Sequence, residues 1–267
     1  MPPGDRPHDP RITVIQQELF DDRKSKVAKY QDLVVGRSGL GALIAYELVM
    51  LCASWVPGAL GLFLRGKLYP LVLGAVGRNV VFGANVTLRH PHKITIGDNV
   101  VIDDQCCLDA KGTDNRGITI GNGVFVGRNT ILSCKNGDIV IEDRANLGFN
   151  CEIFSASTVR VGSDVLMAAY TYLVGGDHLY DRVDIPVLQQ GRTARGIDVG
   201  AGVWLGTHVV VTDGSRVGKD AIIGAGAVVV GEIPEFAIAV GTPAKVLRDR
   251  RAEGAASASP QPPVPSP

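Results

Sequence analysis

Few side chains in this sequence can transfer protons or bind metals near neutral pH. They are five histidines and five cysteines, at His8, His90, His92, His178, His208, Cys52, Cys106, Cys107, Cys134 and Cys151. The histidines lack the clustered spacing of a zinc site and the cysteines form no CxxC pair, so we predict reduced thiols and no metal centre. His178 differs because it lies in the acidic run GGDHLYDRVD, and an imidazole with a pKa near ~6.5 suits a general base.

The overall charge of the chain is balanced. Lys plus Arg and Asp plus Glu each number 27 among 267 residues, which argues against a nucleic-acid-binding protein that relies on bulk positive charge. Hydrophobic residues make up 45% of the chain, enough for a sizeable core, and 33 glycines point to many tight turns. The polar N-terminus does not resemble a signal peptide, so we expect a cytoplasmic protein.

An internal repeat dominates the middle of the chain. Apolar residues recur at every sixth position in seven groups of three: Val76, Phe82, Leu88; Ile96, Ile102, Leu108; Ile120, Val126, Leu132; Ile141, Leu147, Ile153; Val161, Met167, Leu173; Val199, Leu205, Val211; and Val217, Ile223, Val229. A period of six does not fit a helical face. It suits a short strand and a tight corner, so three repeats close one triangular coil and stacked coils share a core.

Extra residues between the groups mark the places where loops leave the coils. The largest lies between Leu173 and Val199, which are 26 positions apart where six would suffice. His178 begins this loop, and long loops on rigid scaffolds are frequent places for function. Asp177, Asp181, Asp184 or a backbone carbonyl could orient its ring. Glu152 is a further candidate for this role, but the repeat points it outward.

The sequence predicts four regions along the chain. We predict a polar N-terminal segment with a helix over residues 1–37, an apolar helical hairpin over 38–75, a β-helix over 76–249 and a disordered tail over 250–267. Residues 38–73 are long and apolar enough to contact a membrane, although Pro57 and Glu47 argue against a simple span. In a membrane, Arg37, Arg65, Lys67, Tyr46, Trp55 and Tyr69 would lie at the interface. The alternative is a soluble cap on the β-helix.

The repeat, together with the runs RGIDVGAGVWLGTHVVV and IPEFAIAVGTPAKVLRDR, resembles the hexapeptide-repeat acyltransferases. The resemblance covers about residues 76–249, and it is strongest to galactoside-type and maltose-type O-acetyltransferases and to acetyltransferases of surface-polysaccharide assembly. It implies an all-β fold, a left-handed parallel β-helix of about seven coils with an N-terminal helical, apolar segment. It also implies acetyl-CoA as cosubstrate, no metal, and a homotrimer with active sites between neighbouring subunits.

The resemblance assigns roles to individual residues. His178 matches the catalytic histidine, and Asn150 with Asp177 would contact the acceptor. The coenzyme would be bound by Trp204, Gly206, Thr207, Ala225, Lys245 and Arg248. The Thr-Lys that many members carry after the AGAVV-type stretch is Val230-Gly231 here, so coenzyme phosphates would depend on Lys245, Arg248 or backbone amides.

The expected function is an acetyl-CoA-dependent O-acetyltransferase that modifies a sugar hydroxyl of a surface polysaccharide or its lipid-linked precursor. Such an enzyme would be peripheral on the cytoplasmic face of the inner membrane. The alternatives are a serine O-acetyltransferase, an amino-sugar N-acetyltransferase, a γ-class carbonic anhydrase and a non-catalytic β-helix scaffold. The sequence leaves the acceptor and the length of the acyl group open.

Overall fold

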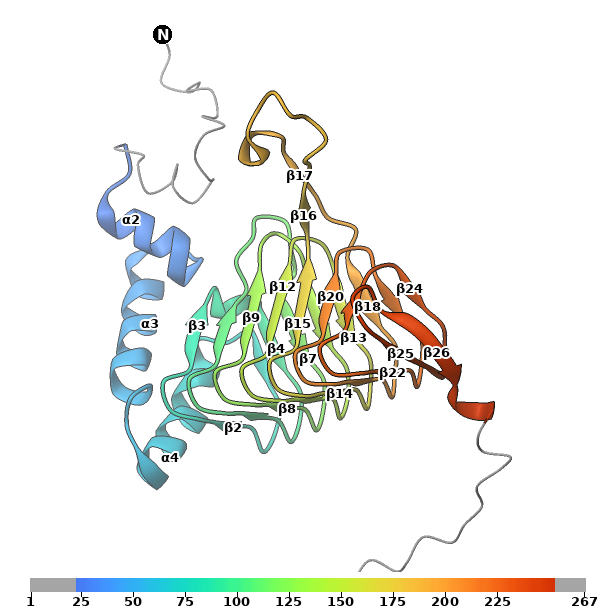
Figure 1. Cartoon of the computed structure of the whole chain (residues 1–267). Coiled ribbons are helices and arrows are strands. Elements are labelled where there is room, and N and C mark those ends of the chain that lie inside the picture. Colours follow the sequence, from blue (N-terminus) through green and yellow to red (C-terminus); the bar gives the residue numbers. More distant parts are fainter. Residues whose placement is uncertain (1–22, 253–267) are drawn as a thin grey trace, which may run out of the picture.

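The computed structural model describes residues 23–252, and the predictions for the first 22 residues and for the tail beyond residue 252 lie outside this range. Most of the described chain winds into a parallel β-helix whose strands form three long sheets (Figure 1). The predicted β-helix is therefore confirmed. At its N-terminal end a group of helices packs against the first turns, and one long loop projects from the side.

Each side of the prism is one sheet, named here A, B and C. Sheet A contains β1 (Ala75–Val76), β4 (Ile94–Ile96), β7 (Ile118–Ile120), β10 (Ile139–Ile141), β13 (Val159–Val161), β18 (Ile197–Val199), β21 (Arg216–Val217) and β24 (Glu232–Ile233). Sheet B contains β2 (Val81–Phe82), β5 (Val101–Ile102), β8 (Phe125–Val126), β11 (Asn146–Leu147), β14 (Leu166–Met167), β19 (Trp204–Leu205), β22 (Ile222–Ile223), β25 (Ala237–Val240) and the antiparallel β26 (Lys245–Asp249). Sheet C contains β3 (Thr87–Arg89), β6 (Cys107–Asp109), β9 (Ile131–Cys134), β12 (Glu152–Ser155), β15 (Tyr172–Gly175), β20 (Val210–Thr212) and β23 (Val228–Val229).

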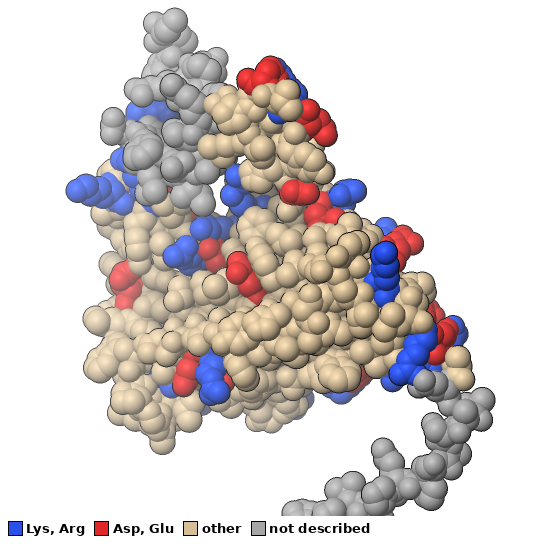
Figure 2. Space-filling view, viewed as in Figure 1, with Lys and Arg blue, Asp and Glu red and all other residues tan. Residues whose placement is uncertain are grey.

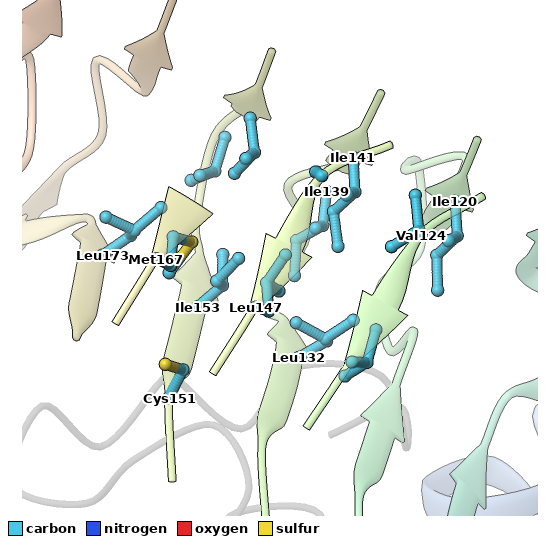
Figure 3. Close-up of a cluster of buried hydrophobic side chains, with 14 of the residues drawn as sticks. Ile120, Val124, Leu132, Ile139, Ile141, Leu147, Cys151, Ile153, Met167 and Leu173 are labelled. Carbon is cyan, nitrogen blue, oxygen red and sulfur yellow. The ribbon is translucent and has the colours of Figure 1, made fainter. Parts of the chain in front are cut away.

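The core consists of stacked rows of like residues. Leu132, Ile153 and Leu173 are register partners in sheet C and lie in one row in Figure 3. Every predicted inward position except the half-buried Val76 is buried. Each fully buried Ile or Leu contributes on the order of 1.5–3 kcal/mol, and full burial requires the neighbouring turns to cover both sides of the row. Burial also raises the pKa of Cys106 and Cys134 to about 12, which keeps these core thiols protonated.

Sheet A has eight strands, so the β-helix has about eight turns rather than the seven predicted. The additional turn uses Ile233 and Ala239, which lie in β24 and β25. Ile233 follows Val229 by only four positions, so this turn breaks the six-residue spacing on which the prediction depended.

Helices cover the N-terminal end of the prism. α2 (Lys26–Tyr30) continues into a π-helical turn η1 (Gln31–Val35), and α3 (Leu40–Ala53) and α4 (Gly58–Leu68) form a hairpin that ends in the 3₁₀ turn η2 (Tyr69–Leu71). Further 3₁₀ turns are η3 (Pro91–Lys93), η4 (Val187–Gln189) and η5 (Arg250–Ala252). We call α3, α4 and η2 the helical cap, because Tyr69 of η2 packs edge-on against Phe82 of β2 at 5.2 Å.

Three of the side chains predicted to lie at a membrane interface are buried instead. Arg65 is 2% exposed and donates hydrogen bonds to the carbonyl oxygens of Ala53, Val56 and Phe82. The hydroxyls of Tyr46 and Tyr69 donate to carbonyls of the first turn of sheet C. The prediction was wrong for these residues because composition does not reveal which face of a helix meets the prism.

The outer face of the cap is apolar and exposed. Its large side chains are Leu40, Ile44, Leu48, Leu51, Trp55, Leu60, Leu62, Phe63 and Leu71. Among the described helices, none is long and apolar enough by itself to cross a membrane, although the bent pair Lys26–Val35 and Leu40–Ala53 reaches the required length and composition.

Candidate active site

The corner between sheet C and sheet A is where this chain departs from a plain repeat. The extra residues that interrupt the six-residue spacing follow β3, β6, β9, β12 and β15, and these are all strands of sheet C. The loops of successive turns therefore emerge along one edge of the prism. The longest of them, residues 176–196, projects well beyond the others (Figure 1). We call this edge the loop edge.

His178 lies at the base of the projecting loop. It belongs to β16 (Asp177–His178), which pairs antiparallel with β17 (Arg192–Thr193), so that His178 faces Arg192 across a two-stranded stalk. The chain passes very close to the preceding turn here, since a Cβ on Gly176 would lie 2.8 Å from that of Ala156. The two strands of the stalk fix the direction in which the histidine leaves the prism.

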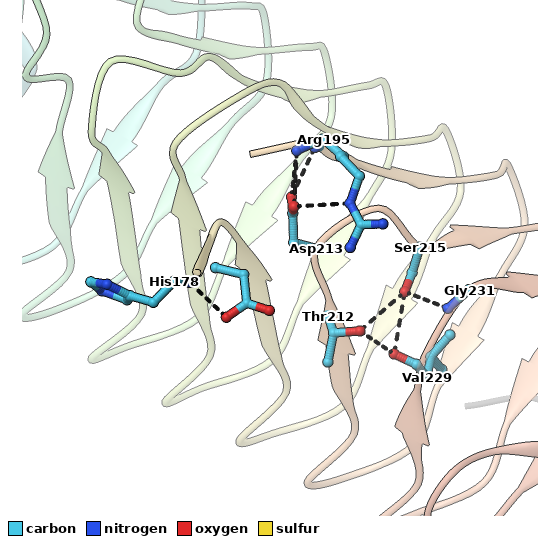
Figure 4. A network of polar contacts seen from close by, with 9 residues as sticks. His178, Arg195, Thr212, Asp213, Ser215, Val229 and Gly231 are labelled. Atoms are coloured by element: carbon cyan, nitrogen blue, oxygen red, sulfur yellow. Dashed lines mark hydrogen bonds and ion pairs between the residues drawn. The ribbon is translucent and has the colours of Figure 1, made fainter. Parts of the chain in front are cut away.

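The returning end of the loop is fixed by a buried carboxylate. Asp213, which is 7% exposed, accepts hydrogen bonds from the backbone N–H groups of Arg195 and Gly196 at 2.9 Å, and the Arg195 guanidinium lies 3.5 Å away (Figure 4). In the same turn Ser215 donates to the carbonyl of Val229 and accepts from the N–H of Gly231. The loop is therefore held at both ends by ordered backbone contacts.

None of the acids predicted to orient the His178 ring does so in this chain. The Asp177 carboxylate accepts a hydrogen bond from the backbone N–H of His178 at 2.7 Å, and Asp184 pairs with Arg182. The Nδ1 atom of His178 is buried and has no hydrogen-bond partner within residues 23–252. A ring nitrogen in this state is available to a bound substrate or to a second subunit.

His178 and Asp177 border a pocket of about 390 Å³ on the outer face of sheet C. Its floor is formed by Phe154, Tyr172 and Val174, and Lys135 with Arg192 supply positive charge at its sides. Burial and the neighbouring Glu152, which points outward as predicted, raise the pKa of Tyr172, so its hydroxyl stays protonated at neutral pH. The sequence prediction missed these pocket residues, although Lys135 lies among the extra residues that it had noted.

Asn150 lies at the opposite end of sheet C from His178. It precedes β12, whereas His178 follows β15, and the two strands run parallel in register. It is one of a column of corner residues with positive φ, formed by Gln105, Asn129, Asn150, Tyr170, His208 and Gly226. The ring of His208 stacks on that of Tyr170 at 4.9 Å. Within a single chain, Asn150 and His178 therefore lie at opposite ends of sheet C.

The residues predicted to bind the coenzyme lie together on the last turns. Trp204 is exposed on the outer face of β19, Gly206 and Thr207 form the following corner, and Ala225 lies directly beyond Gly206. The Thr207 hydroxyl donates to the carbonyl of Ala169 at 2.8 Å. Lys245 and Arg248 lie on β26 along the edge of the same sheet. This group lies at the start of the sheet C strands, whereas His178 lies at their end.

The other two described histidines serve the attachment of the N-terminal helices. The His90 ring hydrogen-bonds the carbonyl of Asp32 at 2.9 Å, and its backbone N–H donates to Val34. A Cβ on Gly36 would lie 2.5 Å from the His90 ring, so only glycine fits there, at a φ of 72°. Within residues 23–252 no group of three or more His, Cys, Asp or Glu side chains is placed to hold a metal ion.

Sequence comparisons agree with this description. A family model described as the hexapeptide repeat of succinyl-transferase matches residues 75–103 and 138–173. A probable acetyltransferase of Mycobacterium tuberculosis is 33% identical over 142 residues, 53% of this chain and 47% of that protein. Galactoside O-acetyltransferase of Escherichia coli K12 is 34% identical over 130 residues, 48% of this chain and 55% of that protein. A candidate lipopolysaccharide biosynthesis O-acetyltransferase of the same strain is 26% identical over 155 residues, 55% of this chain and 78% of that protein.

Among solved structures, an N-acyltransferase from Bacillus cereus in complex with dTDP-4-amino-4,6-dideoxyglucose and coenzyme A has the same fold. It superposes with a TM-score of 0.52 and 16% identity, over 72% of this chain and 91% of that one. The family-model match and the curated relatives show that this chain is similar to the hexapeptide-repeat acyltransferases. It spans about half the length of two of the curated relatives that it matches.

Proposed function

We propose that this protein is an acetyl-CoA-dependent O-acetyltransferase that modifies a sugar hydroxyl in the assembly of a bacterial surface polysaccharide. The observation that carries the proposal is His178, held by the stalk at the mouth of a pocket with a ring nitrogen that no described residue engages. The relatives named as galactoside and lipopolysaccharide O-acetyltransferases support a sugar acceptor.

The proposed reaction is a direct transfer. The acceptor oxygen attacks the thioester carbonyl carbon while the imidazole of His178 takes the hydroxyl proton. The tetrahedral intermediate then collapses, the carbon–sulfur bond breaks, and the proton passes from the imidazolium to the leaving thiolate. Most of the remaining rate enhancement would come from holding the two substrates in line, which rigid strands on both sides of the pocket favour.

His178→Ala tests the assignment. We expect kcat to fall by about 10²- to 10⁴-fold with almost no change in acetyl-CoA affinity, because the change removes a base and not a binding contact. Thiol release from acetyl-CoA in the presence of a sugar acceptor measures the rate, and Arg216→Gln on the polar face of sheet A is the control. Wild-type turnover by His178→Ala would overturn the role of this residue.

The place of the reaction in the cell needs a separate measurement. Ester-linked acetate on surface polysaccharide can be compared between cells with and without the gene, after mild alkaline release. The proposal expects acetate to be lost with the gene and restored by the wild-type protein but not by His178→Ala. Unchanged ester acetate would contradict a role in polysaccharide assembly without contradicting the transfer reaction itself.

We also propose that the active protein is a homotrimer in which one subunit supplies His178 and its neighbour the coenzyme residues. Two features support this. The outer face of sheet B carries an apolar row that includes Val81, Phe125, Leu166 and Trp204, all exposed in the single chain. The projecting loop ends in exposed apolar side chains such as Tyr180 and Val183, which are 68% and 101% exposed.

Mixing two inactive variants tests the shared site. His178→Ala and Trp204→Ala each remove one half of it, so mixed trimers from equal amounts would regain about one quarter of the wild-type activity. Light scattering would confirm the trimer. A fully active monomer, or no recovery on mixing, would contradict the arrangement.

Finally, we propose that the outer face of the helical cap contacts the cytoplasmic leaflet of the inner membrane. Its apolar side chains extend over both α3 and α4, Trp55 lies at the turn between them, and the acid on α3, Glu47, accepts a hydrogen bond from the Tyr30 hydroxyl at 2.6 Å. A face of this kind favours insertion to the depth of the headgroups. Arg37 and Lys67 are exposed and would meet anionic headgroups.

Vesicle flotation tests membrane contact with the full-length protein. Wild type should float with vesicles containing anionic lipid, and Leu51→Glu with Phe63→Glu should remain in the aqueous fraction, because each carboxylate would have to enter an apolar layer. Val230→Glu, on the last turns of the prism, is the control for an added charge. If wild type does not float, the cap acts only as a soluble lid on the β-helix.

A further inference from the structure

Three cations converge on the loop edge from three different turns of the β-helix. Lys111 follows β6, Lys135 follows β9, and Arg192 lies on β17 in the projecting loop that follows β15. Each belongs to the residues that exceed the six-residue repeat. Packing of the prism does not require these insertions, so their side chains can serve a ligand.

The cations lie along one continuous hollow. Beside the pocket at His178 is a second one of about 480 Å³, and Lys135 and Phe154 line both. The second pocket runs from Lys135 past Lys111 to Asp32 and Leu33 of η1. In Figure 2 basic side chains gather in this region, between the helical part of the molecule and the base of the projecting loop. Phe154 gives the hollow an apolar floor against which a sugar ring can lie.

Acidic side chains offset only part of this charge. Asp109 is buried and lies between Lys111 at 3.1 Å and Arg89 at 3.4 Å, and Asp32 pairs with Lys24. Within residues 23–252 neither Lys135 nor Arg192 has a carboxylate within ion-pair distance. The pKa of Lys135 is lowered by burial first and then by the positive charges of Arg192 and Lys111. The three cations are close enough to repel one another, and a bound anion between them would reduce this repulsion.

From this geometry we infer that Lys111, Lys135 and Arg192 form a subsite for an anionic group of the acceptor, a phosphate or carboxylate attached to the sugar. The inference rests on the proposed function, since it names the chemical class of the substrate of that reaction. Lys and Arg bind such oxyanions through charge-assisted hydrogen bonds. With the anion near Lys135, the sugar would lie over Phe154 and place a hydroxyl toward His178.

The position of the hollow favours the acceptor over the coenzyme as its occupant. It extends from His178 toward the first turns and η1, whereas Trp204, Thr207 and Lys245 lie on the last turns. Acetyl-CoA also carries phosphates, so the test must separate the two substrates.

Calorimetric titration of the full-length protein provides that test. The probes are galactose, galacturonic acid, galactose 1-phosphate and UDP-galactose, with coenzyme A titrated separately. We expect the anionic sugars to bind at least about 10-fold more tightly than galactose, and Lys135→Gln and Arg192→Gln each to weaken them by about 10- to 100-fold. Lys219→Gln and Arg216→Gln remove matching charges elsewhere and should change nothing. Circular dichroism verifies that each variant is folded.

The outcomes separate the possible explanations. Tight binding of galacturonic acid as well as galactose 1-phosphate supports a general oxyanion subsite, and preference for UDP-galactose supports a diphosphate. Equal binding of galactose and the anionic sugars overturns the inference, and so does a loss of coenzyme A affinity in Lys135→Gln. Because binding is measured without turnover, charge-dependent binding with no acetyl transfer would overturn the proposed reaction and leave the subsite standing.

Discussion

Arg65 offers a direct test of how the helical cap is attached to the prism. Its buried guanidinium donates to three carbonyl oxygens, at 2.8 Å to Phe82 of β2, 3.1 Å to Ala53 of α3 and 2.7 Å to Val56 between the two helices. It therefore joins both helices of the hairpin to the first turn. Arg65→Met keeps an unbranched apolar side chain and removes all three hydrogen bonds.

The magnitude follows from these contacts. A hydrogen bond from a charged donor contributes about 1.5–3 kcal/mol, and each carbonyl left without a partner costs about 1–3 kcal/mol. The variant regains part of this because it no longer desolvates a charge. The expected destabilisation of the cap is about 3–4 kcal/mol, so its opening equilibrium rises about 10²- to 10³-fold.

Native-state hydrogen exchange measured by mass spectrometry reports this opening locally. In Arg65→Met, peptides from residues 40–68 should exchange about 10²- to 10³-fold faster, while peptides from the central turns, residues 118–174, keep their protection. Lys67→Met removes an exposed cation from the same helix and serves as the control. Exchange of residues 40–68 at the wild-type rate in Arg65→Met would show that the hydrogen bonds do not hold the cap.

Three further predictions concern the base of the projecting loop and the contact between the N-terminal helices and the first turns. Asp213→Asn replaces a carboxylate that accepts from two backbone N–H groups, so the loop base should loosen and kcat should fall by about 10-fold with unchanged coenzyme affinity in steady-state kinetics. Burial, followed by the positive charge of Arg37, lowers the pKa of His92 to about 4. The neutral ring therefore contributes its full stability above its unfolded pKa of ~6.5, and this is lost as the pH falls toward 4, so the denaturation midpoint should drop between pH 7 and pH 4.5 in wild type and less in His92→Gln. Gly36→Ala would push a Cβ into the His90 ring at a φ of 72°, so trypsin should cleave residues 23–37 faster than in wild type.

The repeat made the core of this protein predictable from sequence. Inward positions such as Leu132, Ile153 and Leu173 must be apolar and must recur at a fixed interval, because each turn covers the next. The final turn was missed where Pro234 and a shortened spacing interrupt the interval. The prediction was thus accurate where packing alone determines residue type, and it failed where the chain changes its period.

The surroundings of His178 were less predictable. The sequence located the histidine through the long loop, but Lys111 and Lys135 looked like ordinary loop lysines until the turns were stacked. Lys111 follows the inward Leu108 by three positions, and Lys135 follows the inward Leu132 by the same interval. This shared spacing was a signal that could have been used. Arg65 gave no such signal. A charged residue in an apolar helix is compatible with a membrane interface and equally with a buried hydrogen-bond donor.

The three faces of the prism differ in a way that follows from the repeat. Inward positions are constrained by packing, so only outward positions and corner insertions can vary with function. Sheet A carries polar residues outward, among them Arg160 bridging Glu142 and Asp198. Sheet B carries the apolar row proposed for subunit contact, and sheet C carries the aromatic floor and cationic rim beside His178. In the proposed trimer, sheet A would face solvent, the apolar row of sheet B would contact one neighbour, and sheet C would face the substrate and the other neighbour.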